Sequence, residues 1–265
     1  MLQIIQQTIL ILGTTISAIT DAKTGYIYNW ITYPLLIIGF VLAIIRQQWL
    51  NIIASAIIFT TLYITYKFGK IGGGDVKIFS AIALLNPTGQ VNFLLTTIFF
   101  ASMSAMIFYS IYFTSKYYRK GINFNENKEG ILRAMLFGTI IVIYFGIIIQ
   151  MQTISMTNAG IMLVPILFGL VFLALQEGIK KHFFEQKILT KEIEEDEIIT
   201  ENQNEKAWKI LKGKQLIGKK EKELLKKYKI KYIYVLRHLP PFGPFILLGV
   251  LVATWNPNLI LIIFT

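Results

Sequence analysis

The chain has 265 residues, of which 54% are hydrophobic and only 15% are charged. Soluble globular proteins carry about 25% charged residues, so this composition, with a mean hydropathy of +0.58, predicts a membrane protein. Cysteine is absent, which excludes disulfides and thiolate metal sites, and the spacing of His182 and His238 does not suit a metal site. Cytoplasmic loops of membrane proteins collect Lys and Arg, which explains the net charge of +11 without a nucleic-acid partner.

Eight apolar segments follow one another along the chain. A membrane-spanning helix needs about 20 apolar residues, and only the fourth segment is clearly shorter. The first segment has neither a basic region before it nor a small-residue cleavage site, so we expect a retained span rather than a signal peptide. The segments are residues 2–20, 30–45, 50–66, 74–85, 91–113, 134–151, 154–175 and 242–264.

The placement of basic residues predicts how these segments cross the bilayer. If all eight cross, alternate connections lie on one side and carry 25 of the 26 Lys and Arg residues, leaving only Arg46 opposite. The positive-inside rule then places these connections in the cytoplasm and both termini outside. We therefore expect an all-α polytopic protein of the plasma membrane with about eight apolar helices, the fourth being short.

The segment before the last apolar run is too polar to cross a bilayer. The predicted organisation is a membrane core over residues 1–176, a charged cytoplasmic insertion over residues 177–241 and a C-terminal membrane helix over residues 242–265. Within the insertion, residues 180–200 and 219–228 are predicted to be helical. Residues 230–235 are predicted to form a strand because they are β-branched and aromatic, which makes the insertion α or α+β. The acidic run EIEEDE at residues 192–197 is either a solvated helix face or a contact for a basic substrate segment.

Two carboxylates stand out in the apolar part of the chain. Asp21 and Asp75 are the only acidic residues before Glu126. Asp21 ends the first span and Asp75 begins the fourth, so the predicted topology brings both to the cytoplasmic boundary of the bilayer. An ionisable residue inside a membrane is costly and marks a candidate functional site. The alternative is an interfacial Asp that caps a helix or pairs with Lys23 or Lys77.

Two carboxylates held close together favour acid–base chemistry. They cannot both ionise easily, so they share a proton. One can then take a proton from water while the other donates a proton to a peptide carbonyl and later to the leaving amine. The three glycines Gly72, Gly73 and Gly74 come directly before Asp75 and leave room for an extended substrate strand, or else serve a flexible loop or close helix packing.

Three segments resemble the signature elements of prepilin-type peptidases. Residues 71–77, IGGGDVK, resemble the GxGD motif of intramembrane aspartyl proteases, in the GxGDxK form typical of these peptidases. Residues 21–34, DAKTGYIYNWITYP, resemble the first signature of the family through Ile27, Asn29 and Pro34, although Tyr28 stands where Pro is usual. Residues 240–249, PPFGPFILLG, resemble its C-terminal PFxPFxxxG element.

The resemblance implies a membrane aspartyl endopeptidase that removes the short basic leader, a class III signal peptide, from type IV pilin-like precursors at the cytoplasmic face. It makes Asp21 and Asp75 the catalytic pair. We expect Asn29 to order the loop beside Asp21 and Lys77 to neutralise or orient the site, unless Lys77 is simply a lysine at the membrane edge. The other site-shaping candidates are Gly72, Gly73, Gly74 and Pro34.

The resemblance also bears on cofactors and substrate. Bacterial members often carry a zinc-binding domain with paired CxxC motifs and also methylate the new N-terminus. This chain has no cysteine and a short first loop, so we expect no zinc and no cofactor, and methylation is not supported. The short first loop and late insertion look more like archaeal prepilin or preflagellin peptidases, and the choice between pilin and flagellin precursors stays open.

Two other interpretations compete with this one. Presenilin and signal-peptide-peptidase relatives also use GxGD, but usually place Tyr before the first Asp, where this chain has Thr20. An ion-coupled transporter also uses intramembrane carboxylates, but that interpretation predicts carboxylates near the midplane and two repeated halves. Replacement of either Asp should abolish a peptidase, whereas a transporter could still bind its substrate.

Overall fold

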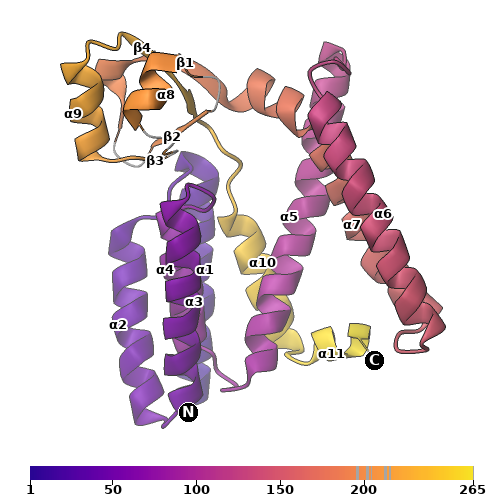
Figure 1. Ribbon diagram of the computed structural model, residues 1–265. Coiled ribbons are helices and arrows are strands. Elements are labelled where there is room, and N and C mark those ends of the chain that lie inside the picture. The colour runs from indigo at the N-terminus through magenta and orange to yellow at the C-terminus, as the bar shows by residue number, and fades with distance from the viewer. Residues whose placement is uncertain (195–196, 201–202, 204, 212–213, 215, 265) are drawn as a thin grey trace.

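The computed structural model describes residues 1–194, 197–200, 203, 205–211, 214 and 216–264 (Figure 1). Every predicted apolar segment is helical, which confirms a mostly helical polytopic membrane protein with a small insertion. The apolar helices are α1 (Leu2–Thr24), α2 (Asn29–Ile45), α3 (Trp49–Lys67), α4 (Gly73–Leu84), α5 (Val91–Lys120), α6 (Lys128–Gln150), α7 (Met156–Ile179), α10 (Gly243–Trp255) and α11 (Leu259–Phe264).

Five of the described helices, α1, α3, α5, α6 and α7, are long and apolar enough to cross a membrane. The helices α2 and α10 are shorter but also apolar. Figure 1 shows both termini at one end of the helices and the polar insertion at the other end, which we call the insertion end. This arrangement agrees with the alternating topology that the basic residues predict.

The short helix α4 lies at the centre of the first four helices. Its residues from Ile78 onward are buried, and they form one apolar core with Leu10 of α1 and Leu35 of α2. At about 1.5 Å per residue, 12 residues span only about 18 Å. Because neighbouring helices surround α4, it does not need the length of a lipid-facing span. Its last turn reaches the start of α1, where Gln6 Nε2 donates a hydrogen bond to the Leu84 carbonyl at 3.3 Å.

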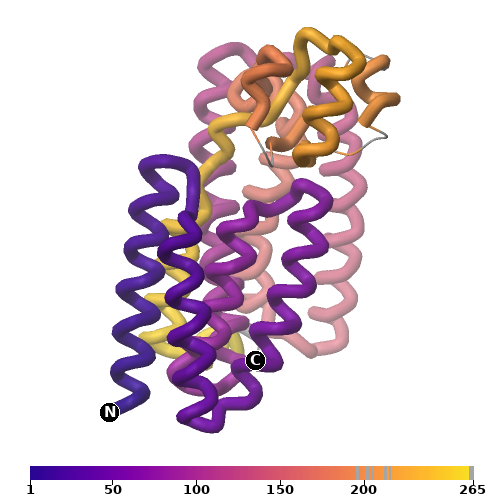
Figure 2. The backbone as a smooth tube through the Cα atoms, turned by 90° about the vertical axis from the view of Figure 1, so that its left-hand side faces the viewer, coloured from indigo at the N-terminus to yellow at the C-terminus, as the bar shows by residue number. Residues whose placement is uncertain are grey.

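The helix α10 joins the two halves of the molecule. It packs between α1 and α5, and α7 packs on α5 with α6 beyond it (Figures 1 and 2). The sequence predicted one continuous helix for the last apolar segment, but the structure has two helices there. The first of them is α10. It ends at Trp255 and resumes as α11, because Pro257 has no backbone N–H and disfavours helical dihedrals at Asn256, which is extended.

The insertion is a small α+β unit that lies over the insertion end of α1–α4 (Figure 1). Its antiparallel sheet has the order β1-β4-β2-β3, and Ile188, Ile199, Ile217 and Val235 bury one side of it in a common core. The elements of the insertion are β1 (Glu185–Leu189), β2 (Glu197–Ile199), α8 (Glu205–Leu211), β3 (Leu216–Ile217), α9 (Lys219–Lys227) and β4 (Tyr232–Leu236).

The predicted helix over residues 180–200 is wrong. A π-helical turn, Lys180–Phe184, continues α7, and β1, a short 3₁₀ turn (Thr190–Glu192) and β2 follow it. The charged residues here alternate with isoleucines, and burial of Ile188, Ile193 and Ile199 in the insertion core favours strands over a solvated helix. The predictions of a helix at residues 219–228 and a strand at residues 230–235 are confirmed by α9 and β4.

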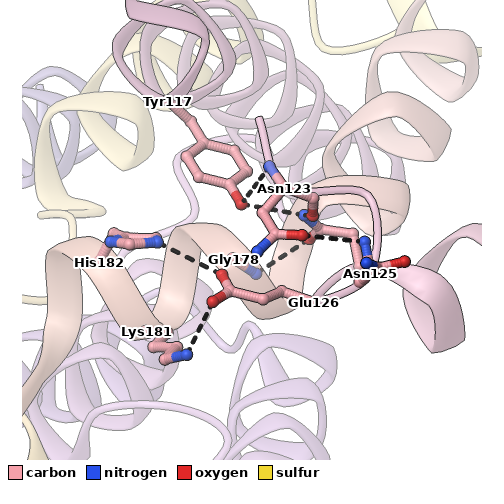
Figure 3. Close-up of polar contacts among 8 residues, drawn as sticks. Tyr117, Asn123, Asn125, Glu126, Gly178, Lys181 and His182 are labelled. Atoms are coloured by element: carbon pink, nitrogen blue, oxygen red, sulfur yellow. Dashed lines mark hydrogen bonds and ion pairs between the residues drawn. The ribbon is translucent and has the colours of Figure 1, made fainter. Parts of the chain in front are cut away.

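A polar network fastens the loop between α5 and α6 to the end of α7 (Figure 3). Asn127 donates a hydrogen bond to the hydroxyl of the buried Tyr117 at 3.0 Å and accepts one from the Gly178 N–H at 2.9 Å. Lys181 forms an ion pair with Glu126 at 2.8 Å, and its hydrogen bond holds the pKa of the Glu126 carboxyl below its usual value. The Nε2 atom of His182 lies 3.3 Å from the same carboxylate. The network therefore fixes the helical arm from which the insertion begins.

Candidate active site

Asp21 lies in the last turn of α1, at the insertion end, and only 6% of it is exposed. Its Oδ2 accepts a hydrogen bond of 2.6 Å from the N–H of Gly243, the first residue of α10, and the N–H of Phe242 also contacts the carboxylate. The helix ends four residues later at Gly25, whose left-handed conformation lets its N–H bond to the Asp21 carbonyl at 2.7 Å. The carboxylate is therefore held by backbone from the far end of the sequence.

Asp75 is the third residue of α4 and lies at the same end of the bundle. Its carboxylate turns back to accept a hydrogen bond from the N–H of Gly72, the residue that caps the helix. The N-terminus of a helix favours a negative charge in its first turn, which suits this position. Asp21 and Asp75 lie close enough to interact electrostatically, so the structure brings together the two carboxylates that the sequence singled out.

The glycine run before Asp75 allows close packing of the two signature loops. A Cβ on Gly74 would lie 2.8 Å from the Ile27 Cβ and 3.0 Å from the Ile27 carbonyl oxygen, closer than real contacts allow. The atoms nearest to a Cβ on Gly73 belong to the Tyr66 ring, at 3.3 Å and beyond. At Gly72 the nearest atom is Asp75 Oδ2, at 3.0 Å. Gly74 thus lets the loop after Asp21 lie directly against the turn that carries Asp75.

The supporting candidates Asn29 and Lys77 contact each other. Lys77 Nζ on α4 donates a hydrogen bond of 2.5 Å to Asn29 Oδ1, at the first residue of α2, and also lies 5.0 Å from the ring centroid of Tyr33. This contact ties the starts of α2 and α4 together beside the carboxylates. Pro34 lies inside α2, where it removes one helical hydrogen bond, and its effect on the site stays a prediction.

The acidic run at residues 192–197 is only partly described, because Glu195 and Asp196 lie outside the described residues. Glu197 binds the Arg237 guanidinium at 2.5 Å, and Glu194 and Glu197 act electrostatically on Tyr26, which lies in the loop after Asp21. Part of the run therefore lies near the loop that follows Asp21.

Two contributors to the site were not found by sequence reasoning. One is the backbone of Gly243, which lies in a segment that resembles a family element but carried no predicted role. The other is Tyr109 on α5, whose hydroxyl donates a hydrogen bond to the Pro241 carbonyl and lies close enough to Asp21 to interact with it. Backbone donors leave no mark in a sequence, and nothing distinguishes Tyr109 among the 13 tyrosines.

Two carboxylates at one end of the bundle could act as an acid–base pair. A water molecule between them could lose a proton to one carboxylate while the other, protonated, donates to the carbonyl of a bound peptide. Within the described residues, no group of three or more His, Cys, Asp and Glu side chains is placed to hold a metal ion.

One comparison with known proteins gives a match. Residues 8–111 match the model of the type IV leader peptidase family, and this matched segment contains both Asp21 and Asp75. The searches of curated proteins and of solved structures give no match. The matched segment covers less than half of the 265 residues.

Proposed function

We propose, from the match of residues 8–111 to the type IV leader peptidase family, that this chain is a membrane aspartyl endopeptidase with Asp21 and Asp75 as its catalytic pair. The observation that carries the proposal is that both carboxylates lie at one end of the bundle, close enough to interact electrostatically. They come from helices that start far apart in sequence, and each accepts backbone hydrogen bonds at the start of a helix.

The proposed reaction is hydrolysis of one peptide bond. One carboxylate of the pair takes a proton from water, and the water oxygen forms a bond to the scissile carbonyl carbon. The other carboxyl group donates its proton to the carbonyl oxygen. The tetrahedral intermediate then collapses, the C–N bond breaks, and the amine leaves with a proton returned by the pair. No side-chain nucleophile takes part.

The proposed substrates are pilin-like or flagellin-like precursors, cleaved between a short basic leader and an apolar helix. The basic loops support a cytoplasmic insertion end in the plasma membrane, because 25 of the 26 Lys and Arg residues belong to connections on that side. Cleavage would then take place at the cytoplasmic face. Residues 1–176 together with the last helix would form the peptidase core, and the insertion would cover it.

The acidic side of the insertion is proposed to attract the basic leader. The electrostatic action of Glu194 and Glu197 on Tyr26 supports this, because Tyr26 follows Asp21 by only five residues. Complementary charge mainly raises the rate of encounter and is weakened by salt. Neutralising Glu192 and Glu194, which leaves the Glu197–Arg237 pair intact, should therefore raise the KM most at low ionic strength. An unchanged KM at low ionic strength would remove this part of the proposal.

The experiment that tests the function is a cleavage assay in lipid nanodiscs. Wild type, Asp21→Asn and Asp75→Asn are incubated with tagged pilin and flagellin precursors, and cleavage is followed by mass spectrometry. Glu129→Gln is the matched control, because Glu129 is an exposed carboxylate whose i,i+4 ion pair is with Arg133.

Cleavage by wild type and the control, with loss in both Asp variants, is the expected result, and the preferred precursor identifies the substrate class. Cleavage that survives in either Asp variant would contradict the aspartyl mechanism. If wild type cleaves neither precursor, the transporter and the presenilin-like protease become the better interpretations.

A further inference from the structure

Tyr109 connects α5 to the candidate active site through the turn that precedes α10. Its hydroxyl donates a hydrogen bond to the Pro241 carbonyl, and Asp21 lies close enough to the hydroxyl to interact electrostatically. The turn runs from Pro240 to Gly243, and its last residue donates the 2.6 Å hydrogen bond to Asp21. Tyr109 thus binds the backbone at Pro241, two residues before Gly243, whose N–H holds the candidate catalytic carboxylate of Asp21.

The ring of Tyr109 is itself held in place. It meets the Phe245 ring edge-on, with centroids 5.1 Å apart, and lies 5.8 Å from the Phe113 ring. Phe113 is buried and packs in turn against Phe184, at the base of the insertion, at 4.9 Å. Aromatic contacts of this kind fix both the position and the orientation of a ring. The hydroxyl is therefore presented at a fixed point rather than by a mobile side chain.

The turn has little room to move against Asp21. Prolines at 240, 241 and 244 restrict its backbone dihedrals. A Cβ on Gly243 would lie 3.0 Å from both the Cβ and Oδ2 of Asp21 and 3.2 Å from the Ala18 Cα. The turn and α1 are therefore in direct contact, and a shift of a few tenths of an ångström would change the hydrogen bond to the carboxylate.

We propose that Tyr109 is a positioning residue of the peptidase, which holds the turn at Pro241 so that the Gly243 N–H remains aimed at Asp21. The inference rests on the proposed function of the carboxylate pair. Tyr109 makes this contact from α5, outside the three signature segments, so the active site depends on the junction of α5 with α10. Misplacement of a catalytic group by a remote change can cost about a hundredfold in rate.

The alternative is that only the ring of Tyr109 matters, as packing between α5 and α10. Tyr109→Phe separates the two roles, because it keeps the ring and removes the hydroxyl that binds the Pro241 carbonyl. The matched control is Tyr112→Phe on the same helix. Tyr112 is 48% exposed, and its ring contacts with Phe108 and Lys116 do not require its hydroxyl.

The test measures kcat, KM and thermal stability of both variants in nanodiscs with a cleavable precursor. Tyr109→Phe should lower kcat by about tenfold to a hundredfold with the KM and the unfolding temperature nearly unchanged, because the turn acts on Asp21 and not on substrate binding. Tyr112→Phe should match wild type. A Tyr109→Phe enzyme that is as active as wild type, or one whose loss lies only in KM, would overturn the inference while leaving the proposed function intact.

A double-mutant cycle with Gly243→Ala adds a second readout. If Tyr109 acts through the turn, the double variant should lose less kcat than the product of the two single losses, because both changes disturb one contact. Losses that multiply would show that Tyr109 acts by another route, and would also overturn the inference. Failure of wild type to cleave any precursor would instead overturn the proposed function, and the inference with it.

Discussion

The N–H of Gly243 donates a 2.6 Å hydrogen bond to Asp21 Oδ2, although 222 residues separate them in the sequence. The contact is made where α10 begins and α1 ends, so helices from the two ends of the chain complete one site. It gives Asp21 a fixed orientation, whereas Asp75 obtains its backbone donor from Gly72 in its own turn. One carboxylate is therefore oriented locally and the other by tertiary structure.

Gly243→Ala should damage the site directly. The added Cβ would lie 3.0 Å from Asp21 Oδ2 and 3.2 Å from the Ala18 Cα, so either the turn or α1 must shift. Overpacking of this kind costs about 1–3 kcal/mol of stability, and the displaced donor should lower kcat by at least about tenfold. Gly160→Ala on α7 is the control, because its Cβ would meet open space. Equal kcat for both variants would contradict the role of this contact.

Gly74→Ala should reduce activity far more than Gly73→Ala. At Gly74 the new Cβ would lie 3.0 Å from the Ile27 carbonyl oxygen, a backbone atom that cannot rotate away. At Gly73 the nearest atom belongs to the Tyr66 side chain and is 3.3 Å away, so the added Cβ needs a smaller adjustment there than at Gly74. Cleavage rates should fall by at least about tenfold for Gly74→Ala and stay within about twofold for Gly73→Ala. The reverse order would show that the loops are not held as described.

Much of the fold could be predicted from the sequence, because a bilayer imposes simple length and charge rules. The apolar runs predicted where the helices lie. The positive-inside rule predicted that the short α4 crosses the bilayer, although its length argued against a span. The break at Asn256 was missed because a hydrophobic run was extended across Pro257, which is a visible signal. The strands β1 and β2 were taken for a helix because their charged residues conceal the short alternation that buries Ile188 and Ile199.

The candidate site was predictable only as far as side chains are distinctive. Asp21 and Asp75 stood out because carboxylates are rare in apolar segments, and the glycine run marked the second of them. The Gly243 N–H could not be foreseen, because every residue except proline has such a donor and only the fold selects one. Lys77 and Asn29 were both predicted as site residues. Their contact was not predicted, because they lie 48 positions apart in the sequence and only the fold brings them together.

Arg46→Met should weaken the fold without changing the chemistry. Arg46 lies at the end opposite the carboxylates, where it donates hydrogen bonds to the Gln6 side chain and, at 3.0 Å, to the Pro87 carbonyl. Gln6 is fully buried, so its oxygen would lose this partner at a cost of about 1–3 kcal/mol in the free energy of unfolding. Denaturant unfolding should show this loss, while kcat at a temperature where the protein is folded stays unchanged. Arg133→Met, which removes the exposed ion pairs with Glu129 and Glu177, is the control.

Glu221 should make the stability of the insertion depend on pH. A hydrogen bond from Lys214 holds the pKa of Glu221 below its usual value, and the carboxylate also accepts the Gly218 N–H at the start of α9. Because the folded pKa lies below the unfolded value of 4.5, the stabilisation is complete above pH 4.5 and disappears as the pH falls through the folded pKa. Hydrogen exchange of the α9 amides should therefore be faster in Glu221→Gln than in wild type at pH 7, by the equivalent of about 1 kcal/mol, and similar at low pH. Glu223→Gln, which changes an exposed neighbour, is the control and should match wild type at both pH values. If the difference in exchange between Glu221→Gln and wild type grew on acidification, that would contradict a lowered pKa of Glu221 in the folded protein.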